Sequence, residues 1–367
     1  MLYALPPTPL YTPLFGMIAG IIVSYLPYTI YTGLASLAVL IGGLTLSSPT
    51  FLRHQLLILS AFFITGIALT TYKLTPARIQ PFYKNHYYTV LSIETAQNKD
   101  WPFKVRLQTI PKQWWQVPLT FMIYTHHNPR LVVGDRIKIP YLSIQKPKDK
   151  HFDLYLKKEG LDGTTFIFSL KSYTKETPRF SPLRFIHSIK QHCLTATKAV
   201  LSPPTYALFL SVFLGNKDAQ KEQLEDLRPL FLLWGLSHQL ARSGLHLLFL
   251  LPLLILILSF LPAPFWVKEF LIITLVGLYA LLSWTSISFL RACCCFFILK
   301  LANIYNHFMP PLHILLLTAL LVLFFNPLQL FFLDFQLSFF LSMALLWINH
   351  VHHARSMNDA KNLNNKK

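Results

Sequence analysis

The residues from 237 to 256 read SHQLARSGLHLLFLLPLLIL. The second half of this stretch is an unbroken apolar run, whereas the first half holds two histidines, an arginine and a Ser–Gly pair that a simple membrane anchor does not need. Ser243 can cap the start of a helix, and Gly244 allows a second helix to approach closely. The start of a helix carries partial positive charge, and Arg242 adds to it. The stretch therefore predicts the wall of a polar cavity that favours anions.

The composition is that of a membrane protein. Hydrophobic residues make up 53% of the 367-residue chain and charged residues only 13%, whereas a soluble domain has about 25% charged residues. A helix that crosses a bilayer needs about 20 apolar residues. Runs of about this length or longer without Asp, Glu, Lys or Arg cover residues 1–52, 54–72, 243–267, 270–290 and 301–333. No basic region precedes the first run, so it is predicted to be a permanent span and not a signal peptide.

Five ionisable residues stand within these apolar regions, namely His238, Arg242, His246, Arg291 and Asp334. An ionised side chain at the centre of a membrane helix costs at least ~2.5–3.5 kcal/mol, so such residues usually face a wet cavity or a partner. We expect Arg291 and Asp334 to approach each other or to line the same polar lumen. Snorkelling of these two side chains to the membrane surface is the alternative.

Loop charges give a topology. The predicted membrane helices cover residues 14–31, 33–46, 55–72, 243–262, 266–285, 286–302, 312–325 and 330–349, and the shorter apolar runs 207–215 and 230–241 are typical of re-entrant helices. Cytoplasmic loops carry an excess of Lys and Arg. Placing Arg53, Lys268, Lys300 and the C-terminal tail in the cytoplasm puts residues 73–202 outside, whether the helices are counted from the N-terminus or from the C-terminus.

The polar region between the membrane helices is predicted to be a β domain. Alternating β-branched and aromatic runs at 86–95, 102–110, 116–125, 134–144 and 163–172 predict short strands, and their number and spacing favour a small barrel of the OB type. A helix is expected at 152–160, between the fourth and fifth strands. Residues 183–201 form an amphipathic pattern that predicts a helix on the membrane surface, with packing on the barrel as the alternative.

This region is also basic, which suggests an anionic partner. Residues 73–202 hold 21 of the 33 Lys and Arg residues but only 8 of the 15 Asp and Glu residues. In a nucleic-acid-binding barrel, phosphates would contact basic strand residues and bases would stack on aromatic ones. The basic candidates are Lys104, Arg106, Arg136 and Lys138. The aromatic candidates are Tyr87, Tyr88, Trp101, Trp114 and Trp115, for which barrel core or membrane anchoring is the alternative.

These observations predict a polytopic α-helical membrane protein with an inserted extracytoplasmic β-barrel domain of the OB type. The expected organisation is membrane helices over 1–72, the β domain over 73–182, an amphipathic linker helix over 183–203, a transmembrane channel domain over 204–350 and a basic cytoplasmic tail over 351–367. The four cysteines show neither zinc spacing nor a disulfide pattern. We expect no metal, no cofactor and no catalytic residue.

Four ordered motifs resemble the ComEC family of competence proteins. GLSHQLARSGLHLLFLLPLL (235–254) is similar to the family signature, and GDRIKIPYLSIQKPKDKHFDLYLKKEGLDGTTFI (134–167) to its N-terminal domain. TSISFLRACCCFFI (285–298) and NPLQLFFLDFQLSFFLSMALL (326–346) resemble two further conserved helices. The residues that carry the resemblance are Gly235, His238, Ser243, Gly244, His246, Arg291, Phe335, Gln336, Ser338 and Phe339. Arg242 and Gln239 replace the usual isoleucine and leucine of the signature.

The resemblance implies an inner-membrane channel component of natural competence that passes single-stranded DNA into the cytoplasm. It implies those ten positions as channel-lining or signature residues, and the ionisable residues Arg242 and Asp334 of the apolar regions are expected to line the channel with them. Many relatives carry a C-terminal metallo-β-lactamase-like nuclease domain, and nothing here resembles its metal motif. We therefore expect no enzymatic activity and expect the partners to be single-stranded DNA, the lipid bilayer, other competence proteins including a separate nuclease and motor, and further copies of the chain.

Two other functions fit the same residues. A transporter of a small anionic solute, or a lipid-handling protein, could use the same histidines and arginines without binding DNA. A passive membrane scaffold is the second alternative. Binding of DNA by the basic β domain distinguishes the channel from both.

Overall fold

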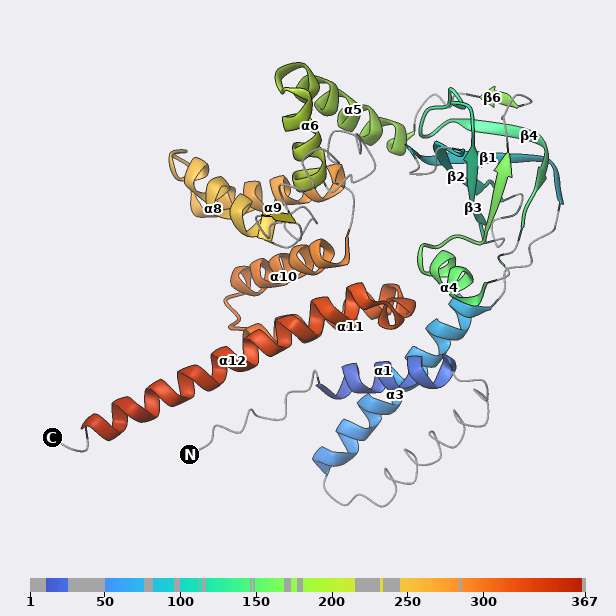
Figure 1. The fold of residues 1–367 in the computed structure, drawn as a ribbon. Helices are drawn as coiled ribbons and strands as arrows, with labels where there is room; N and C mark the ends of the chain where they lie inside the picture. Colours follow the sequence, from blue (N-terminus) through green and yellow to red (C-terminus); the bar gives the residue numbers. More distant parts are fainter. Residues whose placement is uncertain are drawn as a thin grey trace. The chain divides into compact units, whose positions relative to one another are not determined.

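The computed structural model describes residues 11–25, 50–75, 82–95, 100–111, 113, 117–145, 147, 149–167, 173–176, 181–214, 232–233, 245–283 and 286–364. The chain divides into two compact units (Figure 1). Met1–Leu74 and Ile287–Lys367 form the first, and Thr75–Ser286 forms the second.

The first unit is helical. Its elements are α1 (Tyr11–Tyr25), α3 (Thr50–Leu74), α10 (Ile287–Ile304), α11 (Pro311–Phe325), a 3₁₀ turn (Pro327–Phe331) and α12 (Leu333–Asn364). Its core joins α1, α11 and α12 around Met17, Leu323 and Phe335. The predicted span at 33–46 lies outside the described residues, whereas those at 14–31, 55–72, 286–302, 312–325 and 330–349 correspond to α1, α3, α10, α11 and α12.

Helices α1 and α3 pack with their backbones almost in contact. A Cβ atom added at Gly20 would lie 2.2 Å from the carbonyl oxygen of Phe63, and one at Gly16 would lie 2.5 Å from that of Leu59. In the other direction, a Cβ atom at Gly66 would lie 2.5 Å from the carbonyl oxygen of Met17. The hydrophobic effect contributes little to helix association inside a bilayer, so close packing matters more there. Small residues permit this close approach.

The helices α5 (Pro182–Val200), α6 (Pro203–Phe209), α8 (Leu245–Ser259) and α9 (Phe265–Leu282) belong to the second unit, and a π-helical turn (Leu210–Leu214) follows α6. Across the described residues, Leu57–Leu74 of α3, Phe265–Leu282 of α9 and Ile287–Ile304 of α10 are long and apolar enough to cross a membrane. These helices indicate a multi-pass membrane protein.

The second unit also contains a six-stranded mixed sheet. Its strands are β1 (Phe82–Thr95), β2 (Phe103–Thr109), β3 (Thr120–Thr125), β4 (Arg136–Ser143), β5 (Gly163–Ile167) and β6 (Thr174–Glu176), in the spatial order β5-β3-β2-β1-β4-β6. Only the β3–β5 pairing is parallel. The strands predicted from the sequence are confirmed, and so is the predicted helix between the fourth and fifth, which is α4 (Lys150–Lys158). The three-residue strand β6 was not predicted.

One face of the sheet carries the core. Tyr88 and Val90 of β1, Leu107 of β2, Phe121 of β3 and Ile137 of β4 are fully buried there. Because successive side chains of a strand point to opposite faces, the residues between them lie on the opposite face, which we call the outer face. Helix α4 packs on part of the outer face through Leu156, which contacts Met122 of β3 together with Leu161.

The sheet is not closed into a barrel, so this part of the fold prediction is wrong. Among the described residues that follow β4, only Gln145 pairs with β5, through an isolated antiparallel bridge to Thr164. Pro147 has no amide hydrogen to extend the ladder, and Asp149 then caps α4 by accepting a hydrogen bond from the His151 amide at 3.1 Å. The chain therefore leaves the line of β4 after one residue of pairing.

Candidate nucleic-acid interface

The strand register places the four predicted basic residues together on the outer face. Lys104 and Arg106 alternate with the buried Val105 and Leu107 of β2. In β4, Arg136 and Lys138 flank the buried Ile137 in the same way. Thr89 of β1 stands opposite Gln108 on one side and Arg136 on the other, which shows that the two basic pairs share a face.

The basic residues differ in their electrostatic surroundings. Glu94 stands opposite Lys104 in the register, and Glu176 stands opposite Arg136. Arg106 lies 4.0 Å from Glu159, which follows α4. These acids offset part of the positive charge.

Lys138 has a different environment. Its register partners are the uncharged Tyr87 and Thr174, and its ammonium lies 5.5 Å from the centre of the Tyr87 ring. Lys138 is therefore the basic residue of this face that is best placed to attract an added anion.

Aromatic rings lie beside these cations. Tyr124 of β3 stands opposite Lys104, and its ring stacks on that of Phe166 of β5 at 4.9 Å and 16°. Phe166 also contacts Trp101 edge-on at 5.4 Å and is 50% exposed. Burial raises the pKa of the Tyr124 hydroxyl, so this ring stays neutral near a phosphate. We call Trp101, Tyr124 and Phe166 the aromatic cluster.

Helix α4 adds two more rings to this side of the sheet. Phe152 and Tyr155 are exposed, and their rings are nearly parallel with centres 6.4 Å apart. Burial, and after it the negative charge of Glu159, raises the pKa of the Tyr155 hydroxyl. The helix therefore presents neutral aromatic surface next to Arg106.

Two of the predicted stacking residues fit this surface and one does not. Tyr87 is exposed on the outer face, and Trp101 belongs to the aromatic cluster. Tyr88 is fully buried in the core, where burial, followed by the charge of Tyr83, raises the pKa of its hydroxyl. The assignment of Tyr88 to base stacking is therefore wrong, because adjacent strand residues face opposite ways. Trp114 and Trp115 lie outside the described residues.

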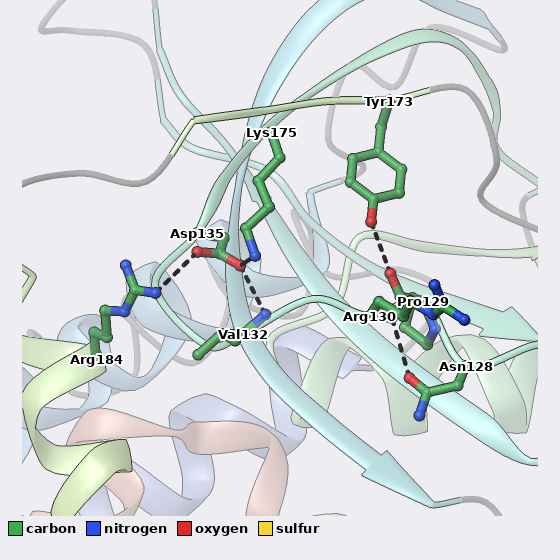
Figure 2. A network of polar contacts seen from close by, with 8 residues as sticks. All are labelled: Asn128, Pro129, Arg130, Val132, Asp135, Tyr173, Lys175 and Arg184. Atoms are coloured by element: carbon green, nitrogen blue, oxygen red, sulfur yellow. Dashed lines mark hydrogen bonds and ion pairs between the residues drawn. The ribbon is translucent and has the colours of Figure 1, made fainter.

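The turn before β4 contains a buried carboxylate. Asp135 has no exposed surface, and it accepts a hydrogen bond from the Val132 amide at 2.7 Å (Figure 2). Its oxygens also lie 2.8 Å from the ammonium of Lys175 in β6 and 3.7 Å from the guanidinium of Arg184 in α5. Asp135 thus joins the turn, β6 and the first turn of α5.

The glycine beside Asp135 is required by the same junction. Gly134 has a φ of +86°, and a Cβ atom there would lie 2.8 Å from Ser181 Oγ and 3.0 Å from Arg184 Cβ. Ser181 caps α5, where its hydroxyl accepts a hydrogen bond from the Arg184 amide at 3.4 Å. The first turn of α5 therefore packs directly against this turn. We call Gly134, Asp135, Lys175, Ser181 and Arg184 the α5 anchor.

In the first unit, Arg291 of α10 binds α12. Its guanidinium donates to the carbonyl oxygen of Ser338 and to the hydroxyl of Ser342, and it lies 5.8 Å from the Phe339 ring. Ser288, one turn earlier, brings its hydroxyl to 3.3 Å from that of Ser338. Arg291 thus lies at a contact between two helices.

The other predicted membrane residues are placed only in part. Asp334 is exposed in the first turn of α12, and Gln336 donates to the Leu330 carbonyl oxygen at 2.8 Å. His246 lies in α8, although its side chain is not described. The remaining signature residues, Gly235, His238, Arg242, Ser243 and Gly244, lie outside the described residues. Within the part of the chain that the structure describes, no group of three His, Cys, Asp or Glu side chains is placed to hold a metal ion.

Sequence reasoning missed Tyr124, Phe166 and the α5 anchor. Residues 134–136 read Gly-Asp-Arg, but spacing alone does not indicate that Asp135 is buried against two cations. Tyr124 and Phe166 alternate with the buried Ile123 and Thr165, so they lie on the outer face. This alternation in the sequence could have identified them.

Comparison with known proteins agrees with the membrane region described above. Residues 213–366 match the family model described as Competence protein. Searches of curated proteins and of solved structures gave no match. The matched region contains α8 to α12, including the contact between Arg291 and Ser338. Residues 213–366 of this chain are therefore a domain of the competence protein (ComEC) type.

Proposed function

We propose that this protein is an inner-membrane component of natural competence that forms, or contributes to, a channel for single-stranded DNA. The observation that carries the proposal is the outer face of the sheet, which holds both the aromatic cluster and Lys138. The same chain contains a membrane region that matches the competence family. Residues 73–202 would lie outside the cytoplasm, where incoming DNA is met first.

The chemistry of the face suits a single strand. Unpaired bases stack on aromatic side chains, with about 1–3 kcal/mol per base, while nearby cations contact the phosphates. The strand pairing also supports an OB-like relationship, because β1 pairs with β2 and β4 while β3 pairs with β5 in parallel. OB domains are partly open barrels that bind oligonucleotides on such a sheet.

A small anion or a lipid headgroup is the second candidate ligand. Either would use the cations of the outer face, but neither needs three clustered rings. The aromatic cluster therefore favours a polymer with bases. The partners of this channel would be a separate nuclease, a motor and further copies of this chain.

Binding of DNA tests the proposal directly. The full-length protein in zwitterionic lipid nanodiscs is expected to bind fluorescent oligo-dT, with affinity that falls as salt rises. Each phosphate contact contributes about 0.7 to the slope of log K against log salt. Lys138→Gln should lower this slope by about 0.7, whereas the matched Arg136→Gln should lower it less, because Glu176 stands opposite Arg136. Absence of binding at low salt, or an unchanged slope in Lys138→Gln, would contradict the proposal.

The aromatic cluster gives a separate prediction. Phe166→Ala should weaken oligo-dT binding by about 5- to 150-fold, which corresponds to the loss of one stacked base. The salt slope should stay unchanged because no charge is lost. Phe166→Trp is the control and should retain affinity. If Phe166→Leu binds as tightly as the wild type, apolar bulk and not stacking holds the ligand.

A further inference from the structure

Helix α5 exposes a complete apolar face. This face consists of Phe185, Ile186, Ile189, Cys193, Ala196 and Val200, which follow the spacing of one helix face. Phe185 is 62% exposed and Val200 is 84% exposed, and no residue of α5 is buried. The apolar face of α5 therefore does not pack on the sheet, which was the alternative to a helix on the membrane surface.

The polar side of α5 is basic. Lys190 lies beside the apolar face, Lys198 lies opposite it on the same side as Gln191, and Arg184 lies at the N-terminal end. The sequence of α5 contains no Asp or Glu. Burial, and after it the charge of Lys190, lowers the pKa of His187, so the histidine contributes no charge at neutral pH. A helix with one apolar face and a basic polar side suits a bilayer that contains anionic lipid.

The two ends of α5 are fixed. The α5 anchor holds its first turn against the turn before β4 through Asp135 and Gly134. At the other end, only Leu201 and Ser202 separate α5 from α6, and the competence-family region begins at residue 213. The helix therefore connects the sheet to the membrane region without a long linker, so lipid is within reach of its apolar face.

We propose that α5 lies along the bilayer surface, with Phe185, Ile189 and Val200 among the acyl chains and Lys190 at anionic headgroups. The α5 anchor then holds the sheet at the membrane surface. This arrangement does not depend on DNA binding, because it is argued from the apolar face and the basic residues of α5.

Spin-label accessibility tests this placement, with the native Cys193 as the probe. Cys193 is exposed, whereas Cys293 is buried and Cys294 and Cys295 are partly buried. The full-length protein, with the three α10 cysteines replaced by alanine, is labelled at Cys193 in nanodiscs. If that variant does not fold, the wild-type protein can be labelled selectively at its exposed cysteine. The matched control is Gln191→Cys in a Cys193→Ala background, since residue 191 lies on the opposite side of the helix.

The nitroxide at Cys193 should be several-fold more accessible to oxygen than to a water-soluble nickel complex, and the nitroxide at residue 191 should show the reverse. Equal nickel access at both positions would place the face in water. Protection from both reagents would place it against protein. Either result overturns the proposal, and neither bears on oligo-dT binding.

The headgroup contact is tested in the same system. Replacing zwitterionic by anionic lipid should increase the oxygen preference at Cys193, and Lys190→Gln should remove this increase. The matched control is Lys198→Gln, on the opposite side of the helix, which should retain it. A response to lipid charge that persists in Lys190→Gln would exclude this lysine as the headgroup contact.

Discussion

Gly20→Val is expected to abolish folding of the first unit. A Cβ atom at this position would meet the backbone carbonyl of Phe63 at 2.2 Å and the amide nitrogen of Ile67 at 3.1 Å. Backbone atoms cannot move aside as a flexible side chain can, so α1 and α3 would have to separate. Overpacking in an ordinary core costs about 1–3 kcal/mol, and this contact, with backbone on both sides, should cost about 3 kcal/mol or more.

Gly277 provides the matched control. It lies in α9, another apolar helix, but a Cβ atom there meets nothing within 4 Å. Gly277→Val should therefore leave the protein folded. Size-exclusion profiles and melting temperatures of the detergent-solubilised variants distinguish the two positions. Equal tolerance of valine at both would show that α1 and α3 do not pack through Gly20.

Asp135→Ala is expected to release β6 and the start of α5 from the sheet. The substitution removes the acceptor of the Val132 amide and leaves Lys175 and Arg184 without their buried counter-charge. Removing one member of a buried ion pair is strongly destabilising. Both cations keep about a third of their side-chain surface exposed, which lowers the cost. We expect a loss of about 2–4 kcal/mol.

Asp153→Ala is the control for the loss of a carboxylate. Asp153 lies 2.9 Å from Lys157 on the surface of α4, and such i,i+4 pairs contribute about 0.3–0.5 kcal/mol. Hydrogen exchange at the Val132 amide and proteolysis between β6 and α5 should both accelerate in Asp135→Ala and stay unchanged in Asp153→Ala. Equal protection in both variants would mean that Asp135 does not hold the junction.

The membrane helices and the strands were predictable because their signals are local. The apolar segments at 266–285 and 286–302 become α9 and α10, since an apolar segment of that length has few alternatives in a bilayer. The alternation in residues 102–110 similarly predicts β2. Each signal depends only on neighbouring residues, so one sequence is enough to identify it.

Barrel closure and side-chain partners were not predictable in the same way. The sheet stays open beyond Gln145 because the chain turns into α4 at Pro147 and Asp149. The alternation of residues within the strands does not indicate where this turn occurs. Arg291 was expected to approach Asp334, to line the same polar lumen or to snorkel, and none of these expectations named Ser338 and Ser342, which its guanidinium binds. Contacts between distant segments depend on how helices pack, and a motif read in isolation contains no information on that.

The partners of Arg291 have a consequence for an energised membrane. The Ser338 carbonyl, the Ser342 hydroxyl and the Phe339 ring are all uncharged, so they hold the guanidinium without cancelling its charge. An elementary charge that crosses the whole membrane changes in energy by about 2.3 kcal/mol per 100 mV. Moving α10 along the membrane normal would therefore require or release electrical work. The amount is proportional to the fraction of the membrane voltage that Arg291 crosses.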